Sequence, residues 1–256
     1  MKRVLLLVVA IAGLSACVVQ PLPSDKTNFM EAARTRNAIA LQYLQMGDLA
    51  KAEGELNAAI KLDPHLPQLY NSLGLMYEQE HDPHNADRNY RRALRMDSDN
   101  GQFHVDYGGF LYRQGHFKAA CEHFQQAAEN LDYDRRDAAY ENLGLCDEQL
   151  HDNALAGQAF QRALALNSNL PMATLEYADL LFEQGDVVRA QRGYVHFLEL
   201  IKKQPQSARS LWLGIRLARL RGDAQAEAGY AQALQKQYPQ SPEYALYQQS
   251  INAHHP

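Results

Sequence analysis

The sequence predicts an all-α protein built from repeated helical hairpins. A small residue recurs on the first helix of each unit at intervals of 34 or 36 residues, at Ala40, Gly74, Gly108, Gly144, Ala178 and Gly214. Small and apolar residues recur in step, with the spacing of one face of a second helix, at Ala52/Leu56/Ala59, Ala86/Tyr90/Ala93, Ala120/Phe124/Ala127, Ala156/Phe160/Ala163, Ala190/Tyr194 and Ala226/Tyr230/Ala233. Turn residues separate the two helices, at Gly47-Asp48, Gly115-His116, Gly185-Asp186 and Gly222-Asp223.

Residues 102–127 form the clearest unit. Tyr107, Gly108 and Leu111 fall on one face of the first helix, and small residues there let the second helix approach closely. A hairpin of this size buries one face and leaves another apolar face open. We therefore expect the units to stack on one another.

This 34-residue helix-turn-helix period resembles the tetratricopeptide repeat. The resemblance implies a right-handed superhelix of six repeats, at residues 33–66, 67–100, 101–134, 137–170, 171–204 and 207–240. Two extra residues around 130–136 lengthen one loop without breaking the stack. Ser241-Pro242 begins a final segment, 241–256, whose helix (Glu243–Ile251) is expected to cover the apolar face of the last repeat.

The chain begins with the pattern of a bacterial lipoprotein leader. Two basic residues, Lys2 and Arg3, precede an apolar run from Val4 to Leu14, and Leu14-Ser-Ala-Cys17 matches a lipobox. A transmembrane anchor is the alternative, but Val4–Val19 is only 16 residues long, and about 20 are needed to span a bilayer. The pattern predicts a signal peptide at 1–16, a lipidated Cys17 and a tether at 17–32.

Residue 18 is Val, whereas an Asp at this place resembles an inner-membrane retention signal. We therefore expect the lipoprotein sorting machinery to deliver the chain to the outer membrane, where a lipid anchor would hold it facing the periplasm. The formal net charge is −5, so the chain lacks the basic stripe that a nucleic-acid groove needs.

The first helices of the early repeats suggest a partner groove. Its predicted members lie where such repeats present their inner face: Asn37, Leu41, Leu44, Leu75 and Tyr112. Packing between adjacent units is the alternative role for these side chains, while an exposed apolar strip would receive a segment of a partner.

Two cysteines remain after Cys17. Cys121 falls on the second helix of repeat three and Cys146 on the first helix of repeat four, which a stacked array makes neighbours. In an oxidising periplasm they could form a disulfide, and two buried free thiols are the alternative.

No site for a metal, a cofactor or catalysis is apparent. His81 and His84 have the separation of a ligand pair, but they flank a helix breaker and lack a third ligand, which favours a solvated loop. No His is followed by Glu and no Gly by Lys, so the zinc-protease and P-loop motifs are absent. We predict a protein that is not an enzyme and has no cofactor.

Four stretches make the resemblance more specific than a generic repeat. They are Asp106-Tyr-Gly-Gly-Phe-Leu-Tyr112, Tyr140-Glu-Asn-Leu-Gly-Leu145, Leu175-Glu-Tyr-Ala-Asp-Leu-Leu181 and Ala208-Arg-Ser-Leu-Trp-Leu-Gly-Ile-Arg-Leu-Ala-Arg219. Together with the lipobox, they resemble the type IV pilus biogenesis lipoproteins of the PilF/PilW family, the pilotins. Asp106 departs from the family pattern, which has Asn there, and the loop after Tyr133 lacks a Pro found in the family.

The resemblance implies a non-enzymatic chaperone. Pilotins bind subunits of the outer-membrane secretin and promote their targeting and assembly into the multimer through which the pilus passes, so they support twitching motility. One alternative is another envelope scaffold of the same architecture, such as a β-barrel assembly lipoprotein or an adaptor for a cell-wall hydrolase. A second is an enzyme whose active site has no recognisable motif.

Overall fold

The computed structural model describes residues 25–252, and the predicted signal peptide, Cys17 and the first part of the tether lie outside them. Within that range the chain is all-α, with thirteen helices: α1 (Asp25–Gln45), α2 (Leu49–Leu62), α3 (Pro67–Gln79), α4 (Pro83–Met96), α5 (Gly101–Arg113), α6 (Phe117–Glu129), α7 (Arg136–Gln149), α8 (Asn153–Leu166), α9 (Pro171–Glu183), α10 (Val187–Ile201), α11 (Ala208–Arg221), α12 (Ala224–Gln237) and α13 (Pro242–Asn252). None of these helices is both long and apolar enough to cross a bilayer.

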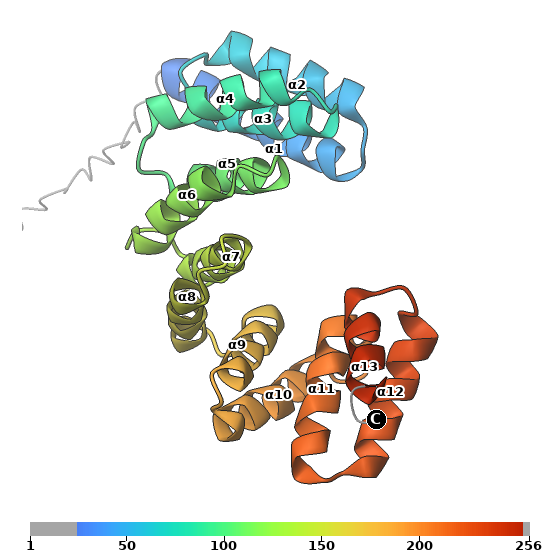
Figure 1. Cartoon of the computed structure of the whole chain (residues 1–256). Coiled ribbons are helices and arrows are strands. Elements are labelled where there is room, and N and C mark those ends of the chain that lie inside the picture. The colour runs from blue at the N-terminus through green and yellow to red at the C-terminus, as the bar shows by residue number, and fades with distance from the viewer. Residues whose placement is uncertain (1–24, 253–256) are drawn as a thin grey trace, which may run out of the picture.

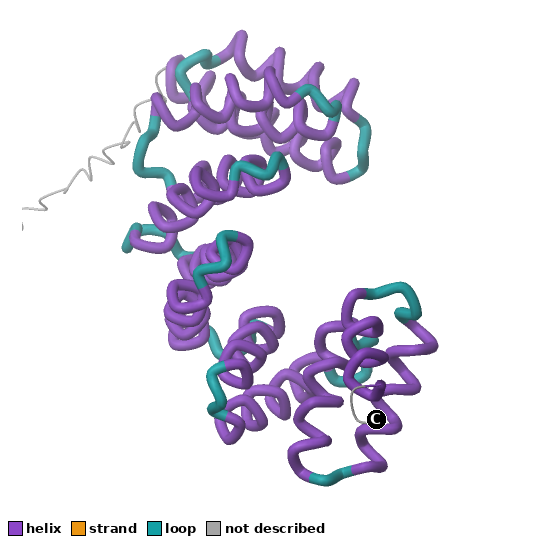
Figure 2. Tube along the Cα trace, in the orientation of Figure 1, coloured by secondary structure: helices purple, strands orange, loops and turns teal. Residues whose placement is uncertain are grey.

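The first twelve helices form six consecutive hairpins. Neighbouring hairpins follow one another along a curved path, with α1 and α2 at one end and α11, α12 and α13 at the other (Figure 1). Short loops join the helices, and no strand appears in the described part of the chain (Figure 2). The predicted all-α repeat architecture is confirmed.

A ring packed against a glycine explains the repeated small residue. A Cβ atom added to Gly74 would lie 2.7 Å from the ring of Tyr90, and one added to Gly144 would lie 2.5 Å from the ring of Phe160. In each case the ring belongs to the second helix of the same hairpin. A larger residue at Gly74 or Gly144 would therefore push the two helices of its hairpin apart.

The hydrophobic core continues from hairpin to hairpin. Small residues of the second helices, such as Ala52 and Ala86, are fully buried, which lets the next hairpin approach. Leu75 packs against the core cluster of the first hairpins and also against the next cluster along the chain. At the far end, α13 packs on α11 and α12 through half-buried Tyr244 and Tyr247.

α1 begins earlier than the sequence suggested. It starts at Asp25, so eight residues that we assigned to the tether are helical. The physical reason is that no glycine or proline interrupts residues 24–46, and Pro23 is the last helix breaker before them.

A repeated turn connects the two helices of each hairpin. One residue takes a left-handed conformation with positive φ, and the next residue caps the second helix. Glycine occupies the left-handed position at residues 47, 115, 185 and 222, whereas His81 and His151 occupy it in the other two hairpins. His81 is therefore a turn residue, and no group of three or more potential ligands that could hold a metal ion occurs within residues 25–252.

The capping residue is aspartate in five of the six turns. Asp48, Asp82, Asp152, Asp186 and Asp223 each accept a hydrogen bond from the backbone N–H three residues further on. His116 makes no such bond, so the first turn of α6 lacks a side-chain cap.

We therefore predict that His116→Asp stabilises the protein, because it would supply the missing acceptor at the start of α6. The expected gain is about 0.5–1 kcal/mol, and Asp152→Ala should lose about 1 kcal/mol at the equivalent place in α8. Urea unfolding followed by circular dichroism measures both. Equal midpoints for His116→Asp and the parent chain would contradict the capping argument.

A disulfide joins the third hairpin to the fourth. Cys121 on α6 and Cys146 on α7 are bonded, with their Cα atoms 5.6 Å apart. Cys146 is fully buried and Cys121 nearly so. The bond closes a segment with a sequence separation of 25 residues, and such a loop contributes about 3 kcal/mol by restricting the unfolded chain.

The disulfide predicts a specific chemical behaviour. Unfolded in denaturant without a reductant, the chain should resist alkylation at both cysteines, and it should take up two alkyl groups there after reduction. Mass spectrometry of the peptides that contain Cys121 and Cys146 distinguishes the two states. Alkylation before reduction would show that the thiols are free.

Candidate partner-binding groove

A groove opens on the first helices of the second, third and fourth hairpins. It has a volume of about 270 Å³ and is lined by Leu75 from α3, by Val105, Asp106, Gly109, Tyr112 and Arg113 from α5, by Phe124 from α6, and by Asn142 and Leu145 from α7. We call this hollow the inner groove. Its apolar floor and polar rim are typical of a surface that receives one or two side chains of a protein segment.

The repeat period explains why these residues meet. Val105, Gly109 and Tyr112 follow one face of α5, whereas Tyr107, Gly108 and Leu111 form the face that is buried. Leu75, Gly109 and Leu145 each directly follow the small residue of their own repeat, so they occupy equivalent positions on α3, α5 and α7.

Gly109 creates the hollow. Both neighbours at the equivalent position are leucines, and the missing side chain between them leaves a gap in an otherwise apolar row. The three atoms nearest to a Cβ added there all belong to the guanidinium of Arg113, the first of them at 3.2 Å. The end of an arginine side chain moves easily, so a larger residue at 109 would fill the groove without displacing the backbone.

The rim of the inner groove is fixed by polar contacts between α3 and α5. Asn71 Nδ2 donates to Asp106 Oδ2 at 2.6 Å, and Gln102 Nε2 donates to Asp106 Oδ1 at 2.8 Å. Arg113 Nε pairs with Glu78 Oε1 at 2.5 Å, and Glu78 also accepts a hydrogen bond from the Tyr90 hydroxyl at 3.0 Å. These contacts hold adjacent repeats in register.

Of the predicted groove residues, Leu75 and Tyr112 line the inner groove together. Leu41 is half-buried on α1 and packs against the core. The assignment of Leu44 was wrong, because this side chain is 5% exposed and belongs to the core cluster. Asn37 is half-buried, and its buried Oδ1 finds no hydrogen-bond partner among the described residues.

The sequence analysis did not predict several of the residues that line the groove. Gly109, Leu145 and Asn142 line it, and none of them was predicted to do so. The available signal was the position directly after the repeated small residue. It reads Leu, Leu, Gly, Leu, Asp and Ile in the six repeats, so the glycine interrupts an apolar series.

Beyond α7 the same series becomes charged. Asp179, the equivalent residue on α9, pairs with Arg209 at 3.1 Å and with Arg216. Arg209 also pairs with Glu148 at 3.0 Å and Glu176 at 2.6 Å, so one cation links α7, α9 and α11. The inner groove therefore ends where this ion-pair network begins.

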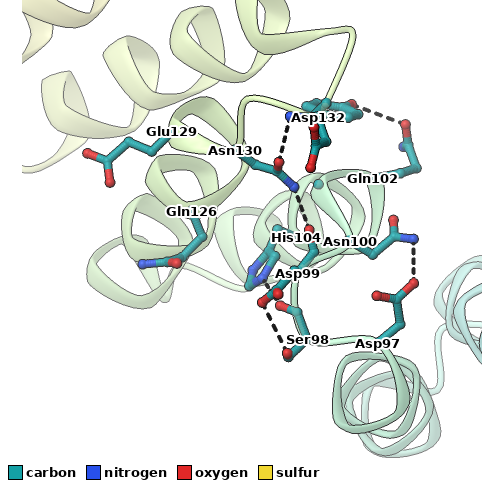
Figure 3. A pocket seen from close by; sticks show the side chains of 12 residues that line it. Asp97, Ser98, Asp99, Asn100, Gln102, His104, Gln126, Glu129, Asn130 and Asp132 are labelled. Carbon is teal, nitrogen blue, oxygen red and sulfur yellow. Dashed lines mark hydrogen bonds between the residues drawn. The ribbon is translucent and has the colours of Figure 1, made fainter.

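A larger hollow lies at the loops between repeats. Its volume is about 590 Å³. Figure 3 shows the side chains that line it, among them Asp97, Asp99, Glu129 and Asp132. Asn130 Nδ2 donates to the Asp99 carbonyl at 2.5 Å, and the Tyr133 hydroxyl donates to Gln102 at 3.1 Å. These bonds dock the lengthened α6–α7 loop on the preceding repeat, which gives the hollow a structural explanation.

The carboxyl group of Asp106 yields a testable pH dependence. Burial raises its pKa, while the amide donors Asn71 and Gln102 act in the opposite direction. The stability that a carboxyl with a raised folded pKa contributes is fully present below its unfolded pKa, about 4, and is lost as pH rises through the folded pKa.

We therefore expect Asp106→Asn, which cannot ionise, to melt about 2–4 °C above the parent chain at pH 7. The difference should shrink as the pH falls toward 4, where the parent carboxyl is protonated. Thermal melts by circular dichroism at both pH values test this. Asp106→Ala, which loses the amide bonds, should melt below the parent at either pH.

Comparison with known proteins agrees with this architecture. A tetratricopeptide-repeat model matches residues 77–135, 111–171 and 196–242, and a second model of the same repeat matches residues 33–66. The solved structure of PilW, described as a widely conserved type IV pilus biogenesis factor, has a TM-score of 0.68 and 24% identity, with 84% of this chain and 97% of that chain covered. At this identity the PilW likeness shows the fold.

A second relative is similar along nearly the whole chain. The type IV pilus assembly protein PilF of Pseudomonas aeruginosa is 36% identical over 250 residues, which cover 96% of this chain and 98% of that protein. Its solved structure superposes with a TM-score of 0.81 and covers 87% of this chain and 99% of that one. The chain therefore belongs to the tetratricopeptide-repeat family that contains the type IV pilus assembly protein PilF.

Proposed function

We propose that this protein is a lipid-anchored pilotin of the outer membrane, which binds subunits of the type IV pilus secretin and promotes their targeting and multimerisation. The assignment to type IV pilus biogenesis rests on the similarity to PilF along nearly the full length of both chains. A lipidated Cys17 would hold the chain at the periplasmic face of the outer membrane. The repeat array would supply the surface that holds the partner.

The observation that carries the proposal is the gap at Gly109. It gives an all-α scaffold an apolar depression between Leu75 and Leu145, on the first helices of neighbouring hairpins. Tyr112 is half-buried at its wall, and a half-buried tyrosine offers both apolar area and a hydroxyl to a partner.

The size of the inner groove favours a protein segment. About 270 Å³ is below the usual range for small-molecule sites, and it suits one or two apolar side chains projecting from a partner. The amide of Asn142 at the rim can bond to the partner's backbone. The relatives PilF and PilW are named for pilus assembly and biogenesis, which agrees with a binding role.

A different envelope scaffold is the second candidate. A β-barrel assembly lipoprotein or an adaptor for a cell-wall hydrolase would use the same repeats with another partner. Purification of the tagged chain in mild detergent distinguishes them, because recovery of the secretin supports the pilotin function. Recovery of barrel-assembly subunits or of a hydrolase, with no secretin, would contradict it.

Filling the groove provides the sharper test. Gly109→Leu should abolish the co-purification of secretin and reduce secretin multimers about tenfold, because the new side chain would occupy the partner's place. Gly229→Leu is the matched control, since it makes the same change within α12, at a glycine with no atom within 4 Å of an added Cβ. Both variants gain similar helix propensity.

Membrane extracts resolved without boiling, followed by immunoblotting, measure the multimers. Equal thermal midpoints for the two variants would show that Gly109→Leu leaves the fold intact. If Gly109→Leu supports normal multimers, the inner groove is not the secretin site.

A further inference from the structure

The first helix carries an apolar stripe that no described residue covers. Phe29 is 50% exposed and Ile39 36%, Ala32 is exposed between them, and Met46, which directly follows the last residue of α1, is 76% exposed. We call these four residues the α1 stripe. At 3.6 residues per turn they fall within about 100° of one another and extend for about 25 Å.

The stripe occupies the end face of the array. It lies about 100° around α1 from the buried residues Ala33, Ala40 and Leu44. Arg36 and Tyr43, which fall between Phe29 and Ala32 around the helix, contact Glu55 and Lys51 of α2. The stripe therefore faces past α2 and away from α3.

Later repeats show what such a face requires. Leu73 and Tyr107 occupy the position equivalent to Ile39, directly before the small residue of their repeats, and they are 8% and 3% exposed. The preceding hairpin covers this face, since α2 packs on α3 and α4 on α5. At the other end of the array, α13 supplies a cover. Terminal repeats that lack a cover need a polar outer face, and α1 has an apolar one.

A lipid anchor at Cys17 would place a lipid surface near the stripe. Only seven residues lie between Cys17 and the start of α1 at Asp25, and the eight steps from Cα to Cα span at most about 26–29 Å. An acyl group on Cys17 would thus keep α1 within one helix length of the bilayer. The sequence of α1 contains three basic and two acidic residues, so its formal charge is +1. The whole chain, by contrast, has a formal net charge of −5.

We propose that the α1 stripe lies on the membrane surface, with Phe29, Ile39 and Met46 in the interfacial region, so that the bilayer covers the open end of the repeat array. The inference rests on the lipid anchor in the proposed function. Apolar side chains on one face of a helix add to membrane affinity in proportion to their buried area, and a second contact of this kind makes a lipid attachment firmer.

Tryptophan scanning of α1 tests this orientation. The lipidated chain is purified from membranes and reconstituted into vesicles of phosphatidylethanolamine and phosphatidylglycerol, with or without brominated acyl chains, which quench nearby tryptophan. Ile39→Trp probes the stripe, and Ala38→Trp is the matched control, exposed on the same turn but rotated by about 100°. The parent chain, whose single tryptophan is Trp212 on α11, gives the background.

Brominated lipid should quench the fluorescence of Ile39→Trp about twice as strongly as that of the parent chain. The quenching of Ala38→Trp should stay close to that of the parent chain. Vesicle flotation reports the anchor separately. If both variants float and neither is quenched, the stripe does not touch the bilayer, although the anchor stands. If neither floats, the anchor fails and the inference fails with it.

Two further outcomes would also overturn the inference. Equal quenching of both variants would show immersion without the proposed orientation. Lack of quenching together with a dimer on size-exclusion chromatography of the detergent-solubilised chain would show that a second copy covers the stripe. Co-purification of secretin is measured independently, so failure of the partner assignment remains distinguishable.

Discussion

The contact of an aromatic ring with a glycine determines the geometry of the central hairpins. Tyr90 on Gly74, Phe124 on Gly108 and Phe160 on Gly144 each place a ring where a Cβ atom would otherwise lie. The close approach buries the small residues of the second helices, and these in turn allow the next hairpin to pack. The other hairpins have a small residue at the same position, so inner-face positions recur at intervals of 34 or 36 residues along the array. The inner groove results from that regularity and from one exception to it, the glycine at position 109.

Most of the fold could be predicted because it follows from local patterns. Recurring small residues, helical spacing and left-handed glycines are visible in the sequence, and they indicate the hairpins and the turns that the structure shows. His81 and His151 were harder to recognise as turn residues, since a left-handed histidine has no distinctive signal. The aspartate that follows each of them preserves the pattern.

The groove could be predicted only in part. Leu75 and Tyr112 were identified from their place on the first helices, but Leu44, at the position equivalent to Tyr112, is buried in the core. An equivalent position can thus face different surroundings at the end of an array and in its interior. Gly109 was missed because its role appears only when the residue is compared with the equivalent positions of the other repeats. Its effect depends on Leu75 and Leu145, which come from other repeats.

The disulfide lies at the middle of the array, beside the groove. A repeat array behaves nearly as a one-dimensional chain, in which each unit is stabilised by its immediate neighbours and the ends open first. Cys121–Cys146 makes one of these junctions covalent, between the third and fourth hairpins. Unfolding that starts at either terminus would therefore reach α5 and α7 last. The groove residues on these two helices would stay ordered after the outer repeats have unfolded.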